Sequence, residues 1–368
     1  MSWIGIDASR AYLAIRTGTE HYSRQVIDHL LRLDSRHRIT LYFNSASPPA
    51  EFADRAECRC LPSPRLWTHG RLSLEMLTNP PDLLFVPAHV LPLIHPERTA
   101  VTIHDTGYLY VPGAYSWTDW WYLRLSTLWN LRRSRVAIVD SHATAGDLAK
   151  LAGRSGSKTR TVHLGVDSRF SPAARSESEH VRSRLGLPER YLLYVGTIQM
   201  RKNLLNLLSA YKLALAEVPT LPALVLAGVD GYRASEIRLL AQRLELDANV
   251  KFTGYAPDAL MPGLIAGAVG LVLVSWYEGF GLPALEAMAC GTPVIASNTT
   301  SLPEVVGDAG LLVPPHDREA IGRSMVRLAS DSTLREDLAD KGLRRAGRFT
   351  WRRCAEETLA ALEEALAG

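Results

Sequence analysis

Short apolar runs alternate with longer amphipathic stretches along most of this chain. The runs are rich in Val, Ile and Leu and are bounded by turn residues, which is typical of buried parallel strands. The runs that we predict as strands are residues 3–6, 39–43, 83–86, 100–103 and 136–139 in the first half, and 191–195, 223–227, 250–252, 271–274 and 293–296 in the second. Strands that alternate with helices indicate parallel sheets covered on both faces. The pattern therefore predicts an α/β fold.

The length of the chain and a change in its composition predict two domains. At 368 residues it is too long for one ordinary core and suits two domains. Residues 168–190 are rich in Ser, Arg and Pro and read as a linker with a lead-in helix. We predict domains at 1–170 and 171–350. The Ala-, Glu- and Leu-rich segment 351–368 reads as one amphipathic helix.

The most informative stretch is 275–293, which follows the predicted strand 271–274. Pro283 suits the first position of a helix, and residues 284–289 are good helix formers up to a stop at Gly291. The free N–H groups of Gly281 and Leu282 then lie at a helix N-terminus, at the sheet edge where anionic ligands bind. Gly279 and Gly281 allow a ligand to approach the backbone closely.

Two glutamates flank this helix start. Glu278 lies in the loop and Glu286 about one turn inside the helix. A carboxylate accepts hydrogen bonds, so the vicinal hydroxyls of a ribose or a sugar are natural partners. Taken singly, Glu278 is also explained as a solvated loop residue and Glu286 as a partner of the helix dipole. Their combination with the glycines and Pro283 favours a binding site.

Glu278-Gly-Phe-Gly-Leu-Pro, with Glu286 after seven intervening residues, resembles the signature of the retaining glycosyltransferases of family GT4. These enzymes have the GT-B fold, in which two Rossmann-like domains face a cleft. The resemblance implies that Glu286 binds the ribose of a nucleotide-sugar donor and that Glu278 lies beside the donor sugar. It places Gly279, Phe280, Gly281 and Leu282 in the donor-binding loop. It also implies that helix 351–368 crosses back to the N-terminal domain.

A pair of cations follows the predicted strand 191–195. Gly196 is followed by a short loop with Arg201 and Lys202, and then by a helix over 204–215. Arg offers a bidentate fork and Lys a point charge, so together they suit a diphosphate. The resemblance implies that Arg201 and Lys202 hold the leaving diphosphate and that Gly196 lies beside it. A solvated Arg-Lys pair is the alternative.

Three further positions are weaker candidates. His104 ends the predicted strand 100–103, where it suits a donor-sugar hydroxyl or the acceptor, with Asp105 fixing its orientation; a structural histidine is the alternative. Gly18 resembles the family's glycine loop, with one glycine where many members have two or more, whereas Tyr22 is expected to pack in the following helix. The resemblance also implies that Tyr255 lies in a loop that contacts the nucleotide base.

Composition excludes several other classes. Lys plus Arg number 41 against 38 Asp plus Glu, so no basic surface for nucleic acid is expected. Four scattered cysteines are too few for a disulfide framework or a four-ligand zinc site. The sequence also contains no Asp-x-Asp motif, which argues against a glycosyltransferase of the metal-dependent GT-A type. We expect no cofactor and no metal. The chain opens on a predicted core strand and contains no apolar run of membrane-spanning length, which favours a cytoplasmic enzyme.

Residues 117–135 are the stretch whose composition suits contact with a membrane surface. Trp and Tyr side chains are interleaved there with four arginines, and a basic aromatic helix can lie at a bilayer interface. Leucines at helical spacing also suit a helix packed in a globular domain, which is the commoner cause of this pattern. We favour packing, with peripheral membrane contact as the alternative.

The predicted activity is transfer of a sugar from a nucleotide-diphosphate donor to an acceptor hydroxyl, with retention at the anomeric carbon. Arg201, Lys202 and the helix start would stabilise charge on the leaving diphosphate. The resemblance favours GDP-mannose, followed by UDP-glucose or a similar donor, and a front-face mechanism over a glycosidase-like double displacement on Glu278. A glycan, a glycolipid or a small molecule would be the acceptor. A non-catalytic sugar-nucleotide-binding partner and a GT-B phosphorylase or epimerase are the alternatives. No Gly-x-Gly-x-x-Gly follows a strand, which argues against a dehydrogenase.

Overall fold

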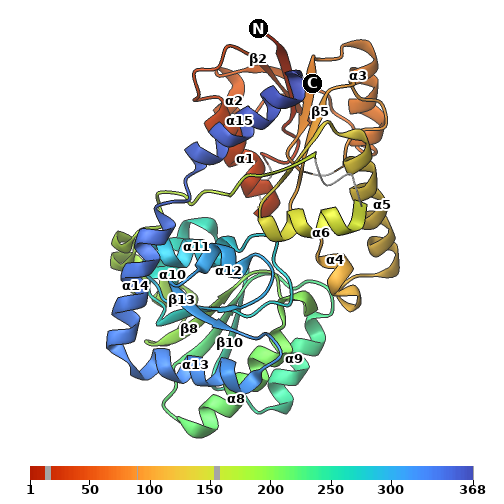
Figure 1. Ribbon diagram of the computed structural model, residues 1–368. Coiled ribbons are helices and arrows are strands. Elements are labelled where there is room, and N and C mark those ends of the chain that lie inside the picture. The colour runs from red at the N-terminus through yellow and green to blue at the C-terminus, as the bar shows by residue number, and fades with distance from the viewer. Residues whose placement is uncertain (13–17, 89, 153–157, 368) are drawn as a thin grey trace. The chain divides into compact units, whose positions relative to one another are not determined.

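A computed structural model describes residues 1–12, 18–88, 90–152 and 158–367 (Figure 1). The chain splits into two compact units. Unit 1 comprises Met1–Thr106, Thr118–Gly165 and Thr350–Gly368, and unit 2 comprises Gly107–Trp117 and Val166–Phe349. Unit 2 thus begins slightly before residue 171 and includes a short segment from the first half of the chain.

Unit 1 is built on a parallel sheet. Its seven strands within the described residues are ordered β3-β2-β1-β4-β5-β6-β7. The strands are β1 (Trp3–Asp7), β2 (Arg38–Phe43), β3 (Glu57–Cys60), β4 (Leu83–Val86), β5 (Thr99–Ile103), β6 (Val136–Val139) and β7 (Thr159–Thr161). The order reverses between β1 and β4. This topological switch point is where ligands bind in open α/β sheets, outside the carboxyl ends of the strands.

Helices cover both faces of this sheet (Figure 1). They are α1 (Gly18–Leu30), α2 (Ala50–Ala53), the π-helical η1 (Trp67–Leu72), α3 (Ser73–Thr78), α5 (Trp117–Arg133), α6 (His142–Ala152) and α15 (Trp351–Ala367). On one face α15 packs against α1 and contacts β4, β5 and β6. Its buried side chains follow the three- and four-residue spacing of an amphipathic helix, as in Trp351, Cys354, Ala355 and Thr358. The C-terminal helix therefore forms part of unit 1.

Unit 2 repeats the same topology. Its six strands in the described part of the chain are ordered β10-β9-β8-β11-β12-β13, all parallel. The strands are β8 (Tyr191–Val195), β9 (Ala223–Ala227), β10 (Val250–Gly254), β11 (Gly270–Leu273), β12 (Val294–Ser297) and β13 (Gly310–Val313). Its switch point lies between β8 and β11, the strands that lead into the predicted donor loops.

The helices of unit 2 pack in pairs, α8 with α13 and α11 with α14. The longer helices are α7 (Ser178–Leu185), α8 (Leu204–Glu217), α9 (Ala234–Arg243), α11 (Leu282–Ala289), α13 (Arg318–Ser330) and α14 (Ser332–Ala346). The shorter ones are α4 (Gly107–Tyr110), η2 (Pro112–Ala114), η4 (Pro172–Glu177), η5 (Met200–Lys202), η6 (Asp258–Leu260), α10 (Met261–Ala266) and α12 (Leu302–Val306).

The predicted α/β fold with two doubly wound parallel sheets is confirmed. The three strands that the apolar pattern did not predict, β3, β7 and β13, each lie at an edge of a sheet. All residues of β3 and β7 are only half-buried, so neither strand needs a continuous apolar run. Edge strands have one neighbour and are covered less than central ones, which removes the signal on which the prediction relied.

Helix α5 has one packed face and one open face. Leu131 and Trp129 pack into the core of unit 1, and the Trp129 indole donates to the Leu91 carbonyl at 3.2 Å. Trp121, Tyr122 and Leu125 are exposed on the same helix. Packing therefore accounts for only part of its apolar residues. No described helix in unit 1 or unit 2 is long and apolar enough to cross a membrane.

Candidate functional site

Glu278 lies in the loop between β11 and α11, in the interior of unit 2. Its side chain is 7% exposed. The Lys202 Nζ donates to both carboxylate oxygens, at 2.8 and 2.9 Å, and the Ser275 hydroxyl donates at 2.6 Å. Burial opposes ionisation of Glu278, but the charges of Lys202 and Arg201 and these hydrogen bonds outweigh it and lower the pKa of the carboxyl. Glu278 is therefore held as a buried, paired carboxylate.

Arg201 and Lys202 lie in η5, between β8 and α8. Arg201 Nη1 donates to the Tyr277 carbonyl at 3.3 Å. Asn203, the N-cap residue of α8, has a φ of 60° and donates through its amide to the Val274 carbonyl at 2.8 Å. That bond links the loop after β8 to the loop after β11. The two cations are thereby fixed beside the Glu278 loop at the switch point of the sheet.

Gly196 occupies a position that requires glycine. Its φ is +144°, in the region that side chains rarely adopt, and a Cβ would lie 2.9 Å from the Tyr194 hydroxyl. The nearest part of Lys202 would be its Cε, at 4.0 Å. Gly196 thus lies in the same loop as Lys202 and lets the backbone pass close to that side chain.

Hydroxyl groups after β12 hold the Glu278 loop. The Ser301 hydroxyl donates to the carbonyls of Glu278 and Phe280, both at 2.9 Å. Thr300 Oγ1 accepts from the Glu278 N–H at 3.2 Å. The φ of Thr300 is 59°, a strained value for a β-branched residue. Sequence reasoning missed both residues, because Ser and Thr in a loop carry no signal of a partner more than twenty residues away.

Helix α11 begins where the glycines and the proline predicted, but the helical position of Pro283 differs from the predicted one. Gly281 is its N-cap with a φ of +108°, and a Cβ there would lie 2.6 Å from Leu302 Cδ2. Leu282 is the first helical residue, so Pro283 occupies the second position rather than the first. The missing N–H of Pro283 still costs nothing, because the first turn of a helix has no internal acceptors for its N–H groups.

Glu286 lies in the same helix, half-buried. Burial raises the pKa of its carboxyl from 4.5 to about 8; the charge of Arg169 opposes this rise, and those of Asp258 and Asp167 add to it. Burial thereby favours the neutral form of Glu286, which donates one hydrogen bond as well as accepting. The sequence interpretation treated it as a carboxylate that only accepts.

The remaining donor-loop candidates differ in exposure. Phe280 is 4% exposed and its ring lies 5.9 Å from Phe349, edge to face, so its side chain belongs to the core of unit 2. Gly279 precedes it in the loop, and Leu282 is the first residue of α11. Tyr255 is 43% exposed and follows β10, which β9 separates from β8. Tyr255 therefore lies farther along the sheet edge than Arg201 and Lys202.

His104 ends β5 in unit 1 and uses both ring nitrogens. Nδ1 lies 2.8 Å from Asp140 Oδ2, and Nε2 lies 2.9 Å from the Pro87 carbonyl. Burial opposes protonation, but the Asp140 charge, both hydrogen bonds and the Asp105 charge raise the pKa of His104. The orienting carboxylate is Asp140 rather than the expected Asp105, because β5 and β6 pair in register and His104 and Asp140 follow them side by side.

The glycine loop of unit 1 is described only in part. Gly18 is the first residue of α1, while Arg16 and Thr17 lie outside the described residues. Tyr22 is fully buried, lies 3.0 Å from Thr102 Oγ1 through its hydroxyl, and packs its ring edgewise on His104 at 4.7 Å. Tyr22 therefore packs, as the sequence indicated.

The predicted residues thus fall into two groups. Unit 2 brings Gly196, Arg201, Lys202 and Glu278 together at one switch point, and carries Glu286 on the adjoining helix. His104 and Gly18 belong to unit 1. The first group is a buried carboxylate with two cations beside the start of a helix, an arrangement that suits an anionic ligand rich in hydroxyls.

Known proteins resemble this chain in sequence. Residues 176–345 match the family model for glycosyl transferases group 1, and residues 16–170 match the model for Glycosyltransferase Family 4. O-antigen chain mannosyltransferase B of Escherichia coli is 35% identical over 266 residues, which is 72% of this chain and 70% of that protein. The chain belongs to glycosyltransferase family GT4. This GT4 enzyme is also 35% identical to the D-inositol 3-phosphate glycosyltransferase of Salinispora arenicola (strain CNS-205), over 62% of its own length and 55% of the relative's.

Solved structures agree on the fold of this GT4 glycosyltransferase. Sucrose-phosphate synthase from Thermosynechococcus elongatus matches with a TM-score of 0.80 and 22% identity, covering 100% of both chains. Anabaena Alr3699/HepE, solved in complex with UDP and glucose, matches with a TM-score of 0.73 and 20% identity over 99% of both chains. At these identities the likeness shows the GT-B fold alone.

Proposed function

We propose that this GT4 glycosyltransferase transfers mannose from a nucleotide-diphosphate donor to an acceptor hydroxyl, with retention at the anomeric carbon, in glycan or glycolipid assembly. One observation carries the proposal: a buried carboxylate, Glu278, is bonded to Lys202 next to Arg201, at the switch point of unit 2. In this proposal unit 2 binds the donor and unit 1 binds the acceptor.

The two cations suit the leaving group. As the bond between the sugar and the diphosphate breaks, negative charge grows on the diphosphate oxygens, and fixed cations stabilise that charge. Lys202 is bonded to Glu278. An ammonium group has three donors, so Lys202 can keep one bond to Glu278 and offer another to a phosphate. Arg201 adds a bidentate fork.

The surroundings of Glu278 favour positioning over nucleophilic attack. A nucleophilic carboxylate needs a free, electron-rich oxygen, and in a double displacement it would bond to the sugar. Both oxygens of Glu278 accept from Lys202, and Oε1 also accepts from Ser275. These bonds lower its pKa and reduce its reactivity. We therefore propose the front-face route, in which a donor phosphate oxygen accepts the proton of the acceptor hydroxyl.

The identity of the sugar donor is proposed from the names of similar proteins. The name mannosyltransferase belongs to the Escherichia coli protein that is 35% identical, which favours GDP-mannose. A second donor, UDP-glucose, is favoured by HepE, a structural neighbour solved with UDP-glucose. A thermal-shift screen of GDP, UDP and ADP tests both, because a ligand at about 100 times its Kd stabilises a protein by about 2.7 kcal/mol. GDP should give the largest shift. A chain that none of the three stabilises would refute nucleotide-sugar binding.

Donor hydrolysis separates catalysis from binding. With GDP-mannose and no acceptor, an active enzyme should slowly release GDP, whereas a non-catalytic binding partner releases none. A phosphorylase would instead need inorganic phosphate and a glycan. We also propose that the reaction needs no cofactor or metal ion, because Arg201 and Lys202 supply the positive charge. A chelator should leave the rate unchanged, and a loss of turnover restored by a divalent cation would contradict this.

The cellular location belongs to the same proposal. We expect a cytoplasmic enzyme with peripheral membrane contact through the open face of α5, where Trp121 and Leu125 are exposed beside Arg124. Sedimentation with anionic vesicles tests the contact, and it should weaken as salt is raised.

A further inference from the structure

A short segment from the first half of the chain, residues 107–115, packs against the loop of unit 2 that carries Arg201. The segment lies between β5 and α5 and consists mainly of α4 and η2. It belongs to unit 2, although β5 before it and nearly all of α5 after it belong to unit 1. η2 contacts η5, the turn that contains Arg201 and Lys202. The 107–115 segment therefore adjoins the two cations of the predicted donor site.

Gly107 lies where three side chains meet. A Cβ at this position would lie 3.1 Å from Arg201 Cδ, 3.1 Å from the Tyr115 hydroxyl and 3.2 Å from Tyr277 Cδ1. A methyl group at these distances would push its neighbours apart. The absence of a side chain at Gly107 thus lets the aliphatic stem of Arg201 and the ring of Tyr277 lie close to the backbone of α4.

Tyr110, at the end of α4, stacks on Tyr277. The two ring centroids lie 5.5 Å apart, and the ring planes differ by 12°. Tyr277 is fully buried, whereas Tyr110 is 50% exposed. Tyr277 immediately precedes Glu278, and its carbonyl accepts the hydrogen bond from Arg201. Tyr110 therefore covers the residue that links Arg201 to the Glu278 loop.

Arg201 depends on packing for a fixed position. Its hydrogen bond to the Tyr277 carbonyl measures 3.3 Å, which is long for an N–H donor. An arginine stem also has several rotatable bonds, and ordering them costs conformational entropy. The 107–115 segment lies against the stem of Arg201 and against the ring of Tyr277, so it restricts both partners of this hydrogen bond.

The 107–115 segment is held in turn by the residues that it contacts. α4 contains four residues and η2 contains three, and helices as short as these are not stable alone. Their conformation must come from packing, which Tyr277 and Arg201 provide on one side. A change in the segment should therefore alter the position of Arg201.

We propose that the 107–115 segment positions Arg201 for the donor diphosphate, with Tyr110 and Gly107 as the positioning residues. Tyr110 acts through Tyr277, and Gly107 leaves room for the Arg201 stem. The proposal rests on the glycosyltransferase function proposed above and adds residues that act through Arg201. A cation held in place before the reaction stabilises the charge on the leaving diphosphate better than a mobile one.

Calorimetry of GDP binding to the full chain tests this proposal. Tyr110→Ala removes the stack and should weaken the affinity for GDP about 2- to 10-fold, the range expected for one aromatic pair. Tyr110→Phe keeps the ring and should bind GDP like wild type. Gly107→Ala places a methyl group about 3.1 Å from Arg201 Cδ and should also weaken GDP binding.

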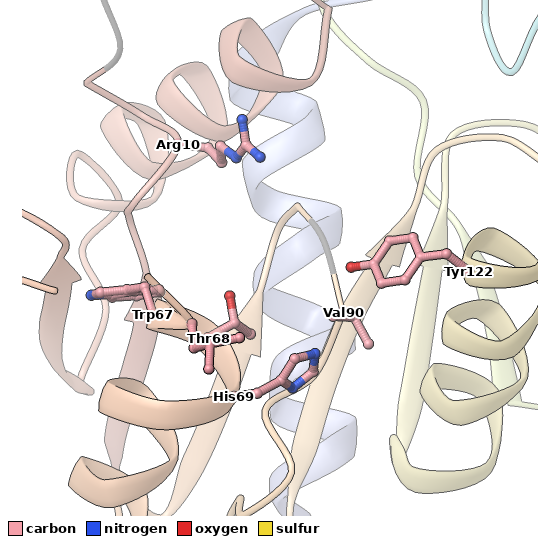
Figure 2. A pocket seen from close by; sticks show the side chains of 7 residues that line it. Arg10, Trp67, Thr68, His69, Val90 and Tyr122 are labelled. Atoms are coloured by element: carbon pink, nitrogen blue, oxygen red, sulfur yellow. The ribbon is translucent and has the colours of Figure 1, made fainter. Parts of the chain in front are cut away.

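Tyr122→Ala is the matched control. Tyr122 is a 55% exposed tyrosine on α5, where it lines a cavity of unit 1 (Figure 2). This variant should bind GDP like wild type. An equal loss of affinity in Tyr122→Ala and Tyr110→Ala would show that the effect is not specific to the 107–115 segment, and would overturn the proposal.

A double-mutant cycle with Arg201→Met separates positioning of Arg201 from general support of the fold. Without the guanidinium, Tyr110→Ala should cause no further loss of GDP affinity. The same fold loss in both backgrounds would show that Tyr110 acts independently of Arg201, which would overturn the proposal. Wild-type affinity in both Tyr110→Ala and Gly107→Ala would also overturn it.

Two further outcomes are distinct. A loss in Tyr110→Phe as large as that in Tyr110→Ala would assign the effect to the hydroxyl and contradict the role of the stack. Failure of wild type to bind any of GDP, UDP and ADP would overturn the proposed function, and the positioning role with it. Normal GDP binding by wild type together with an unaffected Tyr110→Ala and Gly107→Ala would overturn the positioning role alone.

Discussion

Replacing Glu286 with glutamine tests the electrostatics of helix α11. In the folded protein burial raises the pKa of this carboxyl from 4.5 to about 8. Between these two values the folded state holds a proton that the unfolded chain has lost. The free energy of unfolding therefore falls as pH rises through this window. Glutamine cannot ionise, so Glu286→Gln removes this loss.

The magnitude follows from the two pKa values. At ~1.4 kcal/mol per pH unit, the full difference corresponds to about 5 kcal/mol of unfolding free energy. The melting temperature of the variant relative to wild type should rise by about 3–5 °C per pH unit between pH 5 and 8, since ~1 kcal/mol shifts the melting temperature of a domain of this size by 2–4 °C. A constant difference across that range would show that burial does not raise the pKa of Glu286.

Nucleotide binding gives the same residue a second test. Ribose hydroxyls donate to a carboxylate and favour its ionised form, so nucleotide binding should lower the raised pKa of Glu286 and release a proton. The affinity for GDP should rise up to tenfold per pH unit below pH 8 and level off above it. Calorimetry in two buffers of unlike ionisation enthalpy should detect nearly one proton released per GDP at pH 7. An affinity independent of pH, without proton release, would refute the ribose contact.

The other predictions concern the two ion pairs. Glu278→Gln should reduce turnover strongly while calorimetric GDP affinity stays nearly intact, and equal loss of both would contradict a positioning role. Lys202→Met leaves a carboxylate that is 7% exposed without its cation, so the free energy of unfolding should fall by about 3–5 kcal/mol; adding Glu278→Gln should restore most of it, whereas additive losses would show that the pair is not coupled. Asp140→Asn removes the charge that raises the pKa of His104, so the NMR titration of that imidazole should move to lower pH. An unmoved midpoint would assign the raised pKa to another group.

The sequence was sufficient for the central strands of both sheets. Strands such as β4 and β8 are enclosed on all sides, so their residues form continuous apolar runs with the bounds predicted, 83–86 and 191–195. The edge strands β3 and β7 contain no such run. Each is only half-buried, so β3 can carry Glu57 and Arg59, and β7 can carry Arg160. Periodicity reports burial, so it identifies a strand most readily where burial is most complete.

The same limit applies to the site. Glu278, Lys202 and Gly196 were predicted because each belongs to a local motif with a physical reason for its spacing. Asp140 and Thr300 were missed because their partners are distant in sequence and meet only when neighbouring strands end side by side. The raised pKa of Glu286 could not be predicted from the sequence either, since burial within unit 2 is its largest cause. Local spacing therefore identifies candidate residues, whereas the surrounding fold sets the pKa values of their side chains.

The two units share one topology but differ in the charges near the switch point of each sheet. Each sheet reverses its strand order once, and each places polar side chains at that point. In unit 2 two cations face one buried carboxylate, so the pair of loops keeps a net positive charge. In unit 1 the segment after β1 carries Arg10, whose Nη1 lies 3.1 Å from Oε1 of Glu20, so this cation is offset by a carboxylate. A doubly negative diphosphate suits the loops of unit 2 better than this segment of unit 1. The difference in charge supports the proposal that unit 2 binds the donor.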